Sequence, residues 1–489
     1  MKPSAQTDLS RRRFLGQASC AAMSSLSVIN TLLHLKLASR VAAQPAPSDR
    51  RTLVCVYLGG GMDSFNLLMP RDATRHAIYR TTRNELAIPR TGNGAMLPLN
   101  QDPGGDGLEY GIHPSCGSIQ ELFNGLGGDT SKRRAAFVSN VGTLIQPTTL
   151  NDYNNGTVPL PQALFSHSDQ SDQWMTSVPQ GMIQATGWAG RAADILHSTA
   201  NSPGGVAMNM SFAGNNLWQV GGSTNQFVVS TDGALVFTEA GNNDPLHPFT
   251  LKNQAHESIL NETYSNLMQQ SYATLTKESL ELQRSFETAF NNYDTSAIDA
   301  FLPGNNYYST NMLAVAKCIA LREQLGLTRQ TLFVNFGGWD HHGELLQSQI
   351  DMFGEMMPAL AGFQKALETL GLQDSVITYT ATEFGRTLRS NGQGTDHAWG
   401  NNSLIFGGPV QGGRIYGTFP DLTLDGPEDV GYGGRLLPST SVDEMFAEML
   451  RWFGVSSTDL ATVLPNITNF YNPTSSTLPL GFVKAGMWS

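Results

Sequence analysis

Short, nearly continuous apolar segments that each end in a glycine-rich or acidic loop constrain the fold more than any other feature of this sequence. Residues 52–58 read Thr-Leu-Val-Cys-Val-Tyr-Leu and run directly into Gly59-Gly60-Gly61-Met62-Asp63. Residues 331–336 and 375–380 have the same character, and residues 135–141 add a fourth candidate strand. Apolar runs without alternation are typical of strands that are buried on both faces, which occur mainly in parallel sheets.

Amphipathic helical patterns lie between these candidate strands. Residues 312–326 and 345–370 place apolar side chains at helical spacing, and Pro358 is expected to kink the second of these helices. Alternating strands and helices predict an α/β fold with a doubly wound, mostly parallel central sheet and helices on both faces. We expect one such domain over residues 50–489, with a helical insertion at about residues 245–310.

The N-terminus carries the features of an export signal. Residues 10–16, Ser-Arg-Arg-Arg-Phe-Leu-Gly, resemble a twin-arginine signal, and the mildly apolar residues 18–37 are too polar for a stable membrane span. The small residues at 41–43 suit signal peptidase, so we expect a signal peptide over residues 1–43. The implied partner is the twin-arginine translocase during export, and the implied location is the periplasm or the extracellular space. The alternative interpretation is a basic N-terminal tail.

The charge of the chain excludes two classes of partner. The sequence has 30 Lys and Arg against 41 Asp and Glu, and residues 1–43 hold six of the basic residues and one of the acidic ones, so the remainder carries a formal charge of −16. Such a surface argues against a nucleic-acid partner and against electrostatic docking on anionic lipid. The segment after residue 43 contains no stretch that could span a membrane.

Acidic and histidine side chains follow the candidate strands, at the point where each strand ends or just beyond it. Because the carboxyl ends of parallel strands meet at one edge of a sheet, we expect these side chains to converge. Carboxylates and imidazoles together form the ligand set of Zn²⁺ or a similar divalent ion. Each residue alone also has a structural interpretation, such as a turn residue, a hydrogen-bonded loop histidine or a local Glu383–Arg386 ion pair. The candidate ligands are Asp63, Asp340, His341, His342, Glu383, Asp396 and His397.

These loops also resemble the signatures of the domain-of-unknown-function 1501 family, and the resemblance covers nearly all of the chain after residue 43. That family is placed in the alkaline-phosphatase-like superfamily, with sulfatases and cofactor-independent phosphoglycerate mutases. The resemblance therefore implies an alkaline-phosphatase-like α/β fold. The motifs that carry it are Leu58-Gly-Gly-Gly-Met-Asp-Ser64, Gly187-Trp-Ala-Gly-Arg191, Gly337-Gly-Trp-Asp-His-His342, Glu383-Phe-Gly-Arg386, Gly394-Thr-Asp-His397 and Arg451-Trp-Phe-Gly454.

The resemblance implies one or two divalent metal ions, with zinc as the expected metal. An aspartate after the first strand binds one ion in the superfamily, and Asp63 matches it. An aspartate with a nearby histidine binds the other, and Asp340 with His341 or His342 is similar. A final histidine in a glycine-rich loop matches His397. Where the superfamily has Asp-His, this sequence has Glu383-Phe384, so one imidazole ligand is missing.

The segment around residue 167 resembles the part of the superfamily that carries the nucleophile. There a serine or threonine opens a helix, and Trp and Thr follow downstream. Aligning Trp174 and Thr176 with that pattern puts His167 at the nucleophile position, with Ser166 and Ser168 on either side. His167 is therefore a metal ligand, a nucleophile or a sign of altered chemistry. Our candidate catalytic residues are His167, Ser166 and Arg386.

Two functions from different classes follow. The first is an exported metal-dependent hydrolase of phosphate or sulfate esters, which acts on a small-molecule or polymer substrate. The second is a non-catalytic binding or assembly protein on the same fold, which the missing serine and the altered Asp-His pair favour. A serine hydrolase is disfavoured, because the sequence has no Gly-x-Ser-x-Gly nucleophile elbow.

Overall fold

The computed structural model describes residues 49–488 apart from residues 182–184, 202–205 and 235–246. The expected signal peptide, residues 1–43, lies outside the described residues. Within the described part of the chain, no helix is both long and apolar enough to cross a membrane.

The first apolar segment of the sequence forms the central strand of the main sheet. Strand β1 (Arg51–Tyr57) pairs in parallel with β9 (Arg329–Asn335) on one side and with β10 (Val376–Ala381) on the other. Tyr57 lies opposite both Asn335 and Ala381, so the three strands end level. The loops that follow them therefore all begin at one edge of the sheet.

The predicted mostly parallel sheet is confirmed. Its strands lie in the order β12-β5-β11-β10-β1-β9-β6-β7-β8, and β13 pairs with β5. The exceptions to parallel pairing are β11, which is antiparallel to β10 and β5, and β8, which is antiparallel to β7. The other strands of this sheet are β5 (Ala135–Gly142), β6 (Asn209–Ser211), β7 (Gln226–Ser230), β8 (Gly233–Ala234), β11 (Asn401–Gly407), β12 (Ile415–Tyr416) and β13 (Thr440–Ser441).

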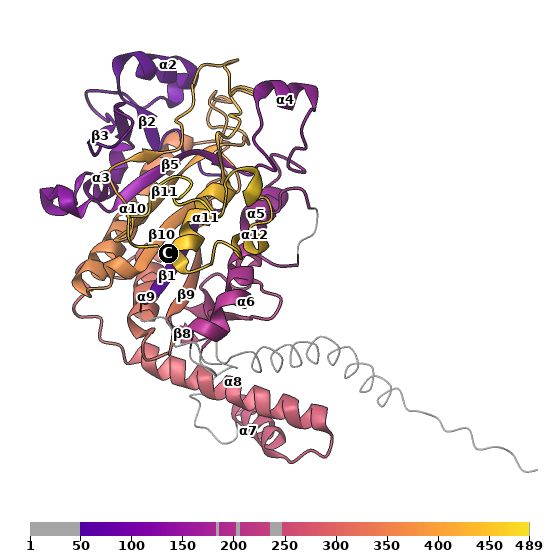
Figure 1. Cartoon of the computed structure of the whole chain (residues 1–489). Coiled ribbons are helices and arrows are strands. Elements are labelled where there is room, and N and C mark those ends of the chain that lie inside the picture. The colour runs from indigo at the N-terminus through magenta and orange to yellow at the C-terminus, as the bar shows by residue number, and fades with distance from the viewer. Residues whose placement is uncertain (1–48, 182–184, 202–205, 235–246, 489) are drawn as a thin grey trace, which may run out of the picture. The chain divides into compact units, whose positions relative to one another are not determined.

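Helices cover both faces of the sheet, as expected for a doubly wound fold (Figure 1). Val54 and Val56 of β1 belong to a buried cluster with side chains of α9 (Tyr307–Leu321) and α10 (Leu345–Thr369). Alternate residues of β1 belong to a second cluster with α6 (Trp188–Ala200) and α11 (Val442–Phe453). Further elements are β2 (Leu68–Pro70), β3 (Leu97–Leu99) and β4 (Tyr110–Ile112) of a small antiparallel sheet, and α2 (Ala73–Arg83), α3 (Gly117–Asn124), α4 (Leu150–Asn155), α5 (His167–Thr176) and α12 (Leu460–Val463).

The chain divides into two compact units, and the smaller of them contains residues 236–285. It holds α7 (Pro248–Asn261) and most of α8 (Leu267–Asn291). Within it, Arg284 forms an ion pair with Glu257 at 2.6 Å, and Lys277 donates to Asn261. These helices lie in the region where the sequence predicts a helical insertion.

Helix α11 begins with a buried carboxyl group whose titration affects stability. Burial raises the pKa of Asp443 from 3.8 to about 7. The folded state then keeps this proton to a higher pH than the unfolded chain does, so its contribution to stability falls as the pH rises from about 4 to about 7.

We expect Asp443→Asn to remove that part of the pH dependence. Between about pH 4.5 and pH 7.5, the free energy of unfolding of the wild type should fall by on the order of 3 kcal/mol more than that of the variant. Urea unfolding of both proteins at the two pH values measures the difference. Equal slopes in the two proteins would show that Asp443 titrates normally.

Candidate metal centre

The site forms where the loops after β1, β9 and β10 meet. Gly60, in the loop after β1, has a φ of +122°, and a Cβ atom there would lie 2.5 Å from the backbone nitrogen of Asp340. Only glycine fits this approach. The Gly60 N–H donates to Oε1 of Glu383 at 2.8 Å, so the three loops are joined directly.

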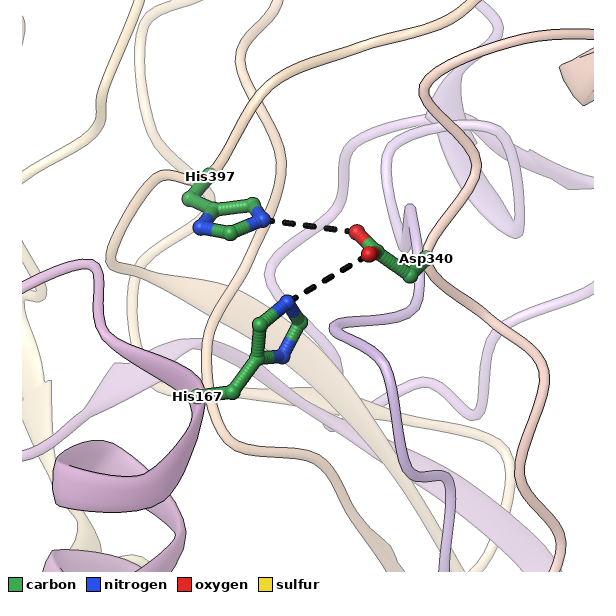
Figure 2. A group of neighbouring side chains, drawn as sticks. All are labelled: His167, Asp340 and His397. Atoms are coloured by element: carbon green, nitrogen blue, oxygen red, sulfur yellow. Dashed lines mark hydrogen bonds and ion pairs between the residues drawn. The ribbon is translucent and has the colours of Figure 1, made fainter.

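Two histidines from distant parts of the chain point at Asp340 (Figure 2). His167 is the first residue of α5, and its Nε2 lies 3.5 Å from Oδ2 of Asp340. His397, in the loop between β10 and β11, has its Nε2 3.3 Å from Oδ1 of Asp340. One ligand atom from each of the three side chains lies within 4.8 Å of the other two, as a shared metal ion requires.

A third histidine completes a compact triangle of ligand atoms. Nε2 of His342 lies 3.1 Å from Oδ1 of Asp340 and 3.1 Å from Nε2 of His397. The third edge, from His397 to Asp340, is 3.3 Å. A tetrahedral zinc ion with bonds of about 2.0 Å separates its ligand atoms by about 3.3 Å. The three atoms of the triangle are therefore spaced as three ligands of one zinc ion would be. A fourth coordination position would remain for water or substrate.

Each of the three imidazoles is held at its other nitrogen by an acceptor. Nδ1 of His167 lies 2.7 Å from Oε1 of Glu383, and Nδ1 of His342 lies 3.0 Å from Oδ1 of Asp396. Nδ1 of His397 lies 2.8 Å from the backbone oxygen of Phe165. A proton placed on each Nδ1 satisfies these acceptors and leaves each Nε2 lone pair directed at the site. This arrangement is typical of metal-ligating histidines.

The charges of the site also suit a cation. Partial burial acts to raise the pKa of Asp340, but the hydrogen bond and charge of Arg386, together with His342 and His167, hold it below its usual value. Burial lowers the pKa of His397, and the Arg386 charge acts in the same direction. Ionised carboxylate and neutral imidazole are the forms that bind a metal ion.

Arg386, which the sequence suggested as a catalytic residue, has a structural position instead. Its buried guanidinium donates to the backbone oxygens of Gly61 at 2.6 Å and Thr395 at 3.0 Å, and also to the Gly60 oxygen and to Asp340. Because the N–H groups of Arg386 bind three backbone carbonyls and one carboxylate, they hold the loops and the Asp340 side chain in place. In this structure Arg386 positions the loops and Asp340, and its expected catalytic role stays a prediction.

Glu383 and Asp396 were expected to be ligands. In the structure they contact the Nδ1 atoms of His167 and His342 and do not belong to the triangle. Glu383 is buried and accepts from His167, from the Gly60 N–H, from the Tyr57 hydroxyl at 3.3 Å and from Thr382 at 3.2 Å. Asp396 accepts from His342. Both carboxylates therefore orient imidazoles.

Asp63 and His341 do not join the group. Asp63 is fully buried, forms an ion pair with Nη2 of Arg83 at 2.5 Å and accepts from the Phe65 N–H at 3.2 Å. His341 is buried, and its Nδ1 has no hydrogen-bond partner in the described structure. Neither side chain lies in the triangle of ligand atoms, and their expected roles as metal ligands stay predictions.

Sequence reasoning placed Ser166 at the site and missed two groups. The Ser166 hydroxyl donates to Asp169 within the first turn of α5. The Phe165 carbonyl that holds His397 leaves no signal in the sequence, because any residue has a carbonyl. Tyr57 ends β1, and its hydroxyl lies 2.6 Å from the Ser171 hydroxyl as well as near Glu383. Its position at a strand end was the signal that could have found it.

Comparison with known proteins identifies the family. The family described as "Protein of unknown function (DUF1501)" matches residues 50–464. The chain belongs to the DUF1501 family. No curated protein matches the sequence.

Two solved structures are distantly similar to this DUF1501 protein. The integral membrane protein lipooligosaccharide phosphoethanolamine transferase A (EptA) from Neisseria meningitidis is 9% identical, with a TM-score of 0.30 over 91% of this chain and 70% of that one. The soluble domain of the same transferase, also 9% identical, has a TM-score of 0.26 over 76% of this chain and 82% of that one. At 9% identity and TM-scores of 0.30 and 0.26, these similarities support no conclusion about the fold or the activity of this protein.

Proposed function

We propose that this DUF1501 protein is an exported, metal-dependent hydrolase of phosphate or sulfate esters. The observation that carries the proposal is the convergence of three imidazole Nε2 atoms on Asp340, each imidazole being held at Nδ1 by its own acceptor. The motifs after β1, β9 and β10 resemble those of the alkaline-phosphatase-like superfamily and support the same reaction class.

His342, His397 and Asp340 would hold the ion, and zinc suits this donor set. When bound, a divalent ion polarises an ester and stabilises negative charge on the transferring group. The protein's own groups complete the site. His167 opens α5, where unpaired backbone N–H groups favour an anion such as the transferring group.

The Glu383 carboxylate orients the imidazole of His167, as the carboxylate of a catalytic triad orients its histidine. An imidazole held in this way can act as a nucleophile or as the general base that activates one. Glu383 accepts the Nδ1 proton of His167, which fixes the ring and directs Nε2 toward Asp340. Burial and the Glu383 charge raise the pKa of the Tyr57 hydroxyl, so Tyr57 stays protonated and donates to Glu383. We propose that Nε2 of His167 either attacks the phosphorus or sulfur atom, so that the alcohol leaves and water then hydrolyses the histidine-bound group, or takes a proton from a water molecule that attacks as the alcohol leaves.

The test measures metal content and ester hydrolysis on one variant. We expect His167→Ala to lower kcat for 4-nitrophenyl phosphate or 4-nitrophenyl sulfate by at least about 100-fold, as loss of a nucleophile or general base does. The metal content should stay above half of the wild-type value, because the triangle remains. His256→Ala, in the smaller unit, is the matched control. The wild type is collected from the periplasmic fraction, and its recovery there tests export.

Two outcomes contradict this assignment. Loss of metal together with activity in His167→Ala would make His167 a ligand. Bound metal without turnover of either ester by the wild type would favour the second candidate, a non-catalytic binding protein. That candidate is supported by the serine next to the nucleophile position, because the Ser166 hydroxyl donates to Asp169.

A further inference from the structure

A cavity of about 410 Å³ lies beside the metal centre. It forms between the loop that follows β10 and the loop around residues 424–433. Its size lies within the roughly 300–1,000 Å³ of small-molecule pockets. The side chains that matter for the argument are Arg389, Asp396, Asp425, Asp429 and Tyr432.

The cavity and the metal centre share structural parts. Asp396 lines the cavity and also accepts from Nδ1 of His342. Arg435 donates to the backbone oxygen of His397 at 2.8 Å, and its guanidinium lies 4.0 Å from the ring centre of Phe165 and 4.5 Å from that of Tyr432. Tyr432 in turn lines the cavity. These shared residues fix the position of the cavity relative to the candidate metal ligands.

Two charged groups of opposite sign in this cavity have no protein partner. In the part of the chain that the structure describes, neither the guanidinium of Arg389 nor the carboxylate of Asp425 makes a side-chain hydrogen bond or ion pair. Asp429 differs, because its carboxylate accepts from the N–H groups of Asp425 and Gly431. Arg389 and Asp425 are both exposed, and their charged groups are free to bind a ligand.

Two residues that line the cavity have a strained backbone conformation. Asp425 and Tyr432 both have a φ of 57°, in the left-handed region that non-glycine residues rarely adopt. Phe165, on the other side of Arg435, has a φ of 72°. Such strain gathers at ligand-binding positions, where the surrounding structure maintains it.

The chemistry of the lining selects the ligand. The lining holds three carboxylates, of which Asp396 and Asp429 already accept hydrogen bonds from protein groups. The two remaining charges, those of Arg389 and Asp425, have opposite signs, so a ligand with a single charge is attracted by one and repelled by the other. A pair of neighbouring hydroxyl groups avoids this repulsion, because one can donate to Asp425 while the other accepts from Arg389. Tyr432 is 81% exposed and offers an apolar ring surface to the C–H groups of such a ligand.

We propose that this cavity binds a sugar, as the part of the ester substrate that does not react. The proposal rests on the proposed function, in which the ester group lies at the metal centre, and it names the substrate class as sugar phosphates or sugar sulfates. Binding of the remote sugar then positions the ester for the reaction.

Direct binding tests the cavity without any turnover. The probes are methyl α-D-glucopyranoside, methyl α-D-galactopyranoside and methyl α-D-mannopyranoside, measured by calorimetry against the whole mature protein. We expect at least one glycoside to bind, and Asp425→Asn and Arg389→Ala to weaken that binding by about 10-fold or more, since each removes a charge-assisted hydrogen bond. Asp351→Asn and Arg90→Ala, at exposed positions, are the matched controls and should bind as the wild type does. Binding of ethanolamine or acetate in place of the glycosides would overturn the proposal.

Kinetics on two esters separates this proposal from the proposed function. The first ester is the sugar 1-phosphate that matches the bound glycoside, which is glucose, galactose or mannose 1-phosphate, and the second is 4-nitrophenyl phosphate. In Asp425→Asn, kcat/KM for the sugar phosphate divided by kcat/KM for 4-nitrophenyl phosphate should fall at least about 10-fold. Hydrolysis of both esters with an unchanged ratio would overturn the sugar site and leave the hydrolase standing. Glycoside binding that depends on Asp425, in a protein that hydrolyses no ester, would support the sugar site and overturn the hydrolase.

Discussion

Asp340→Asn is expected to weaken divalent metal binding by more than about 100-fold, because loss of an outer-shell partner alone costs about 10–100-fold in affinity. Oδ1 of Asp340 is a corner of the triangle with His342 and His397, and Oδ2 faces His167. An asparagine in the same orientation presents a neutral oxygen or an N–H₂ group, which cannot replace a carboxylate at a cation. Mass spectrometry of the metal content of purified protein measures the loss, and ester hydrolysis should fall with it.

The variant should keep its fold, so the result is interpretable. Arg386 still donates to three backbone oxygens when the Asp340 charge is removed. The thermal unfolding midpoint of metal-free variant and metal-free wild type should therefore agree within a few degrees. Asp351→Asn, an exposed acidic position on α10, should retain full metal content. Wild-type metal content in Asp340→Asn would show that the ion binds elsewhere.

The second large effect concerns stability. Arg83 and Asp63 are both fully buried and form an ion pair at 2.5 Å, and Nη1 of Arg83 also donates to the backbone oxygens of Thr387 and Leu388. Arg83→Met leaves the Asp63 carboxylate buried without its counter-charge. We expect the free energy of unfolding to fall by about 3–5 kcal/mol, the usual cost of breaking a buried pair on one side. Urea unfolding measures this change.

A second variant distinguishes a structural Asp63 from a metal-ligating one. In Asp63→Asn/Arg83→Met the uncompensated charge is gone, so the double variant should be more stable than Arg83→Met alone. The folded double variant should also bind metal as the wild type does. A folded Asp63→Asn protein without metal would return Asp63 to the ligand set and contradict a purely structural role for this carboxylate.

The sheet could be predicted from the sequence because burial on both faces leaves a clear pattern. Residues 52–58, 331–336 and 375–380 are apolar without alternation, and β1, β9 and β10 occupy them almost residue for residue. The antiparallel β11 was not foreseen, since a central strand is apolar in either direction. Strand direction depends on the path of the connecting loop, which the apolar pattern does not record.

The loops of the site could be predicted, but the direction of each side chain could not. His341 and His342 are adjacent in the sequence, yet only His342 faces Asp340. Asp63 was expected at the centre because it follows β1, but its partner Arg83 at the end of α2 turns it into the protein. Glu383 lies where predicted and acts through His167, because a carboxylate in contact with an imidazole has the same sequence signal as a ligand. Loop torsions and long-range ion pairs decide these cases.

The position of β1 at the centre of the sheet has a consequence for when the protein can fold. Both of its partners, β9 and β10, come from the second half of the chain. During synthesis both edges of the first strand stay unpaired until β9, which ends at residue 335, has left the ribosome, and the edge that pairs with β10 stays unpaired until residue 381 has done so. Contacts of such long range form slowly. Asp340, His342 and His397 are also made late, so the candidate metal centre can form only after residue 397 has been made. A nascent chain of this kind needs protection from edge-to-edge association for most of its synthesis.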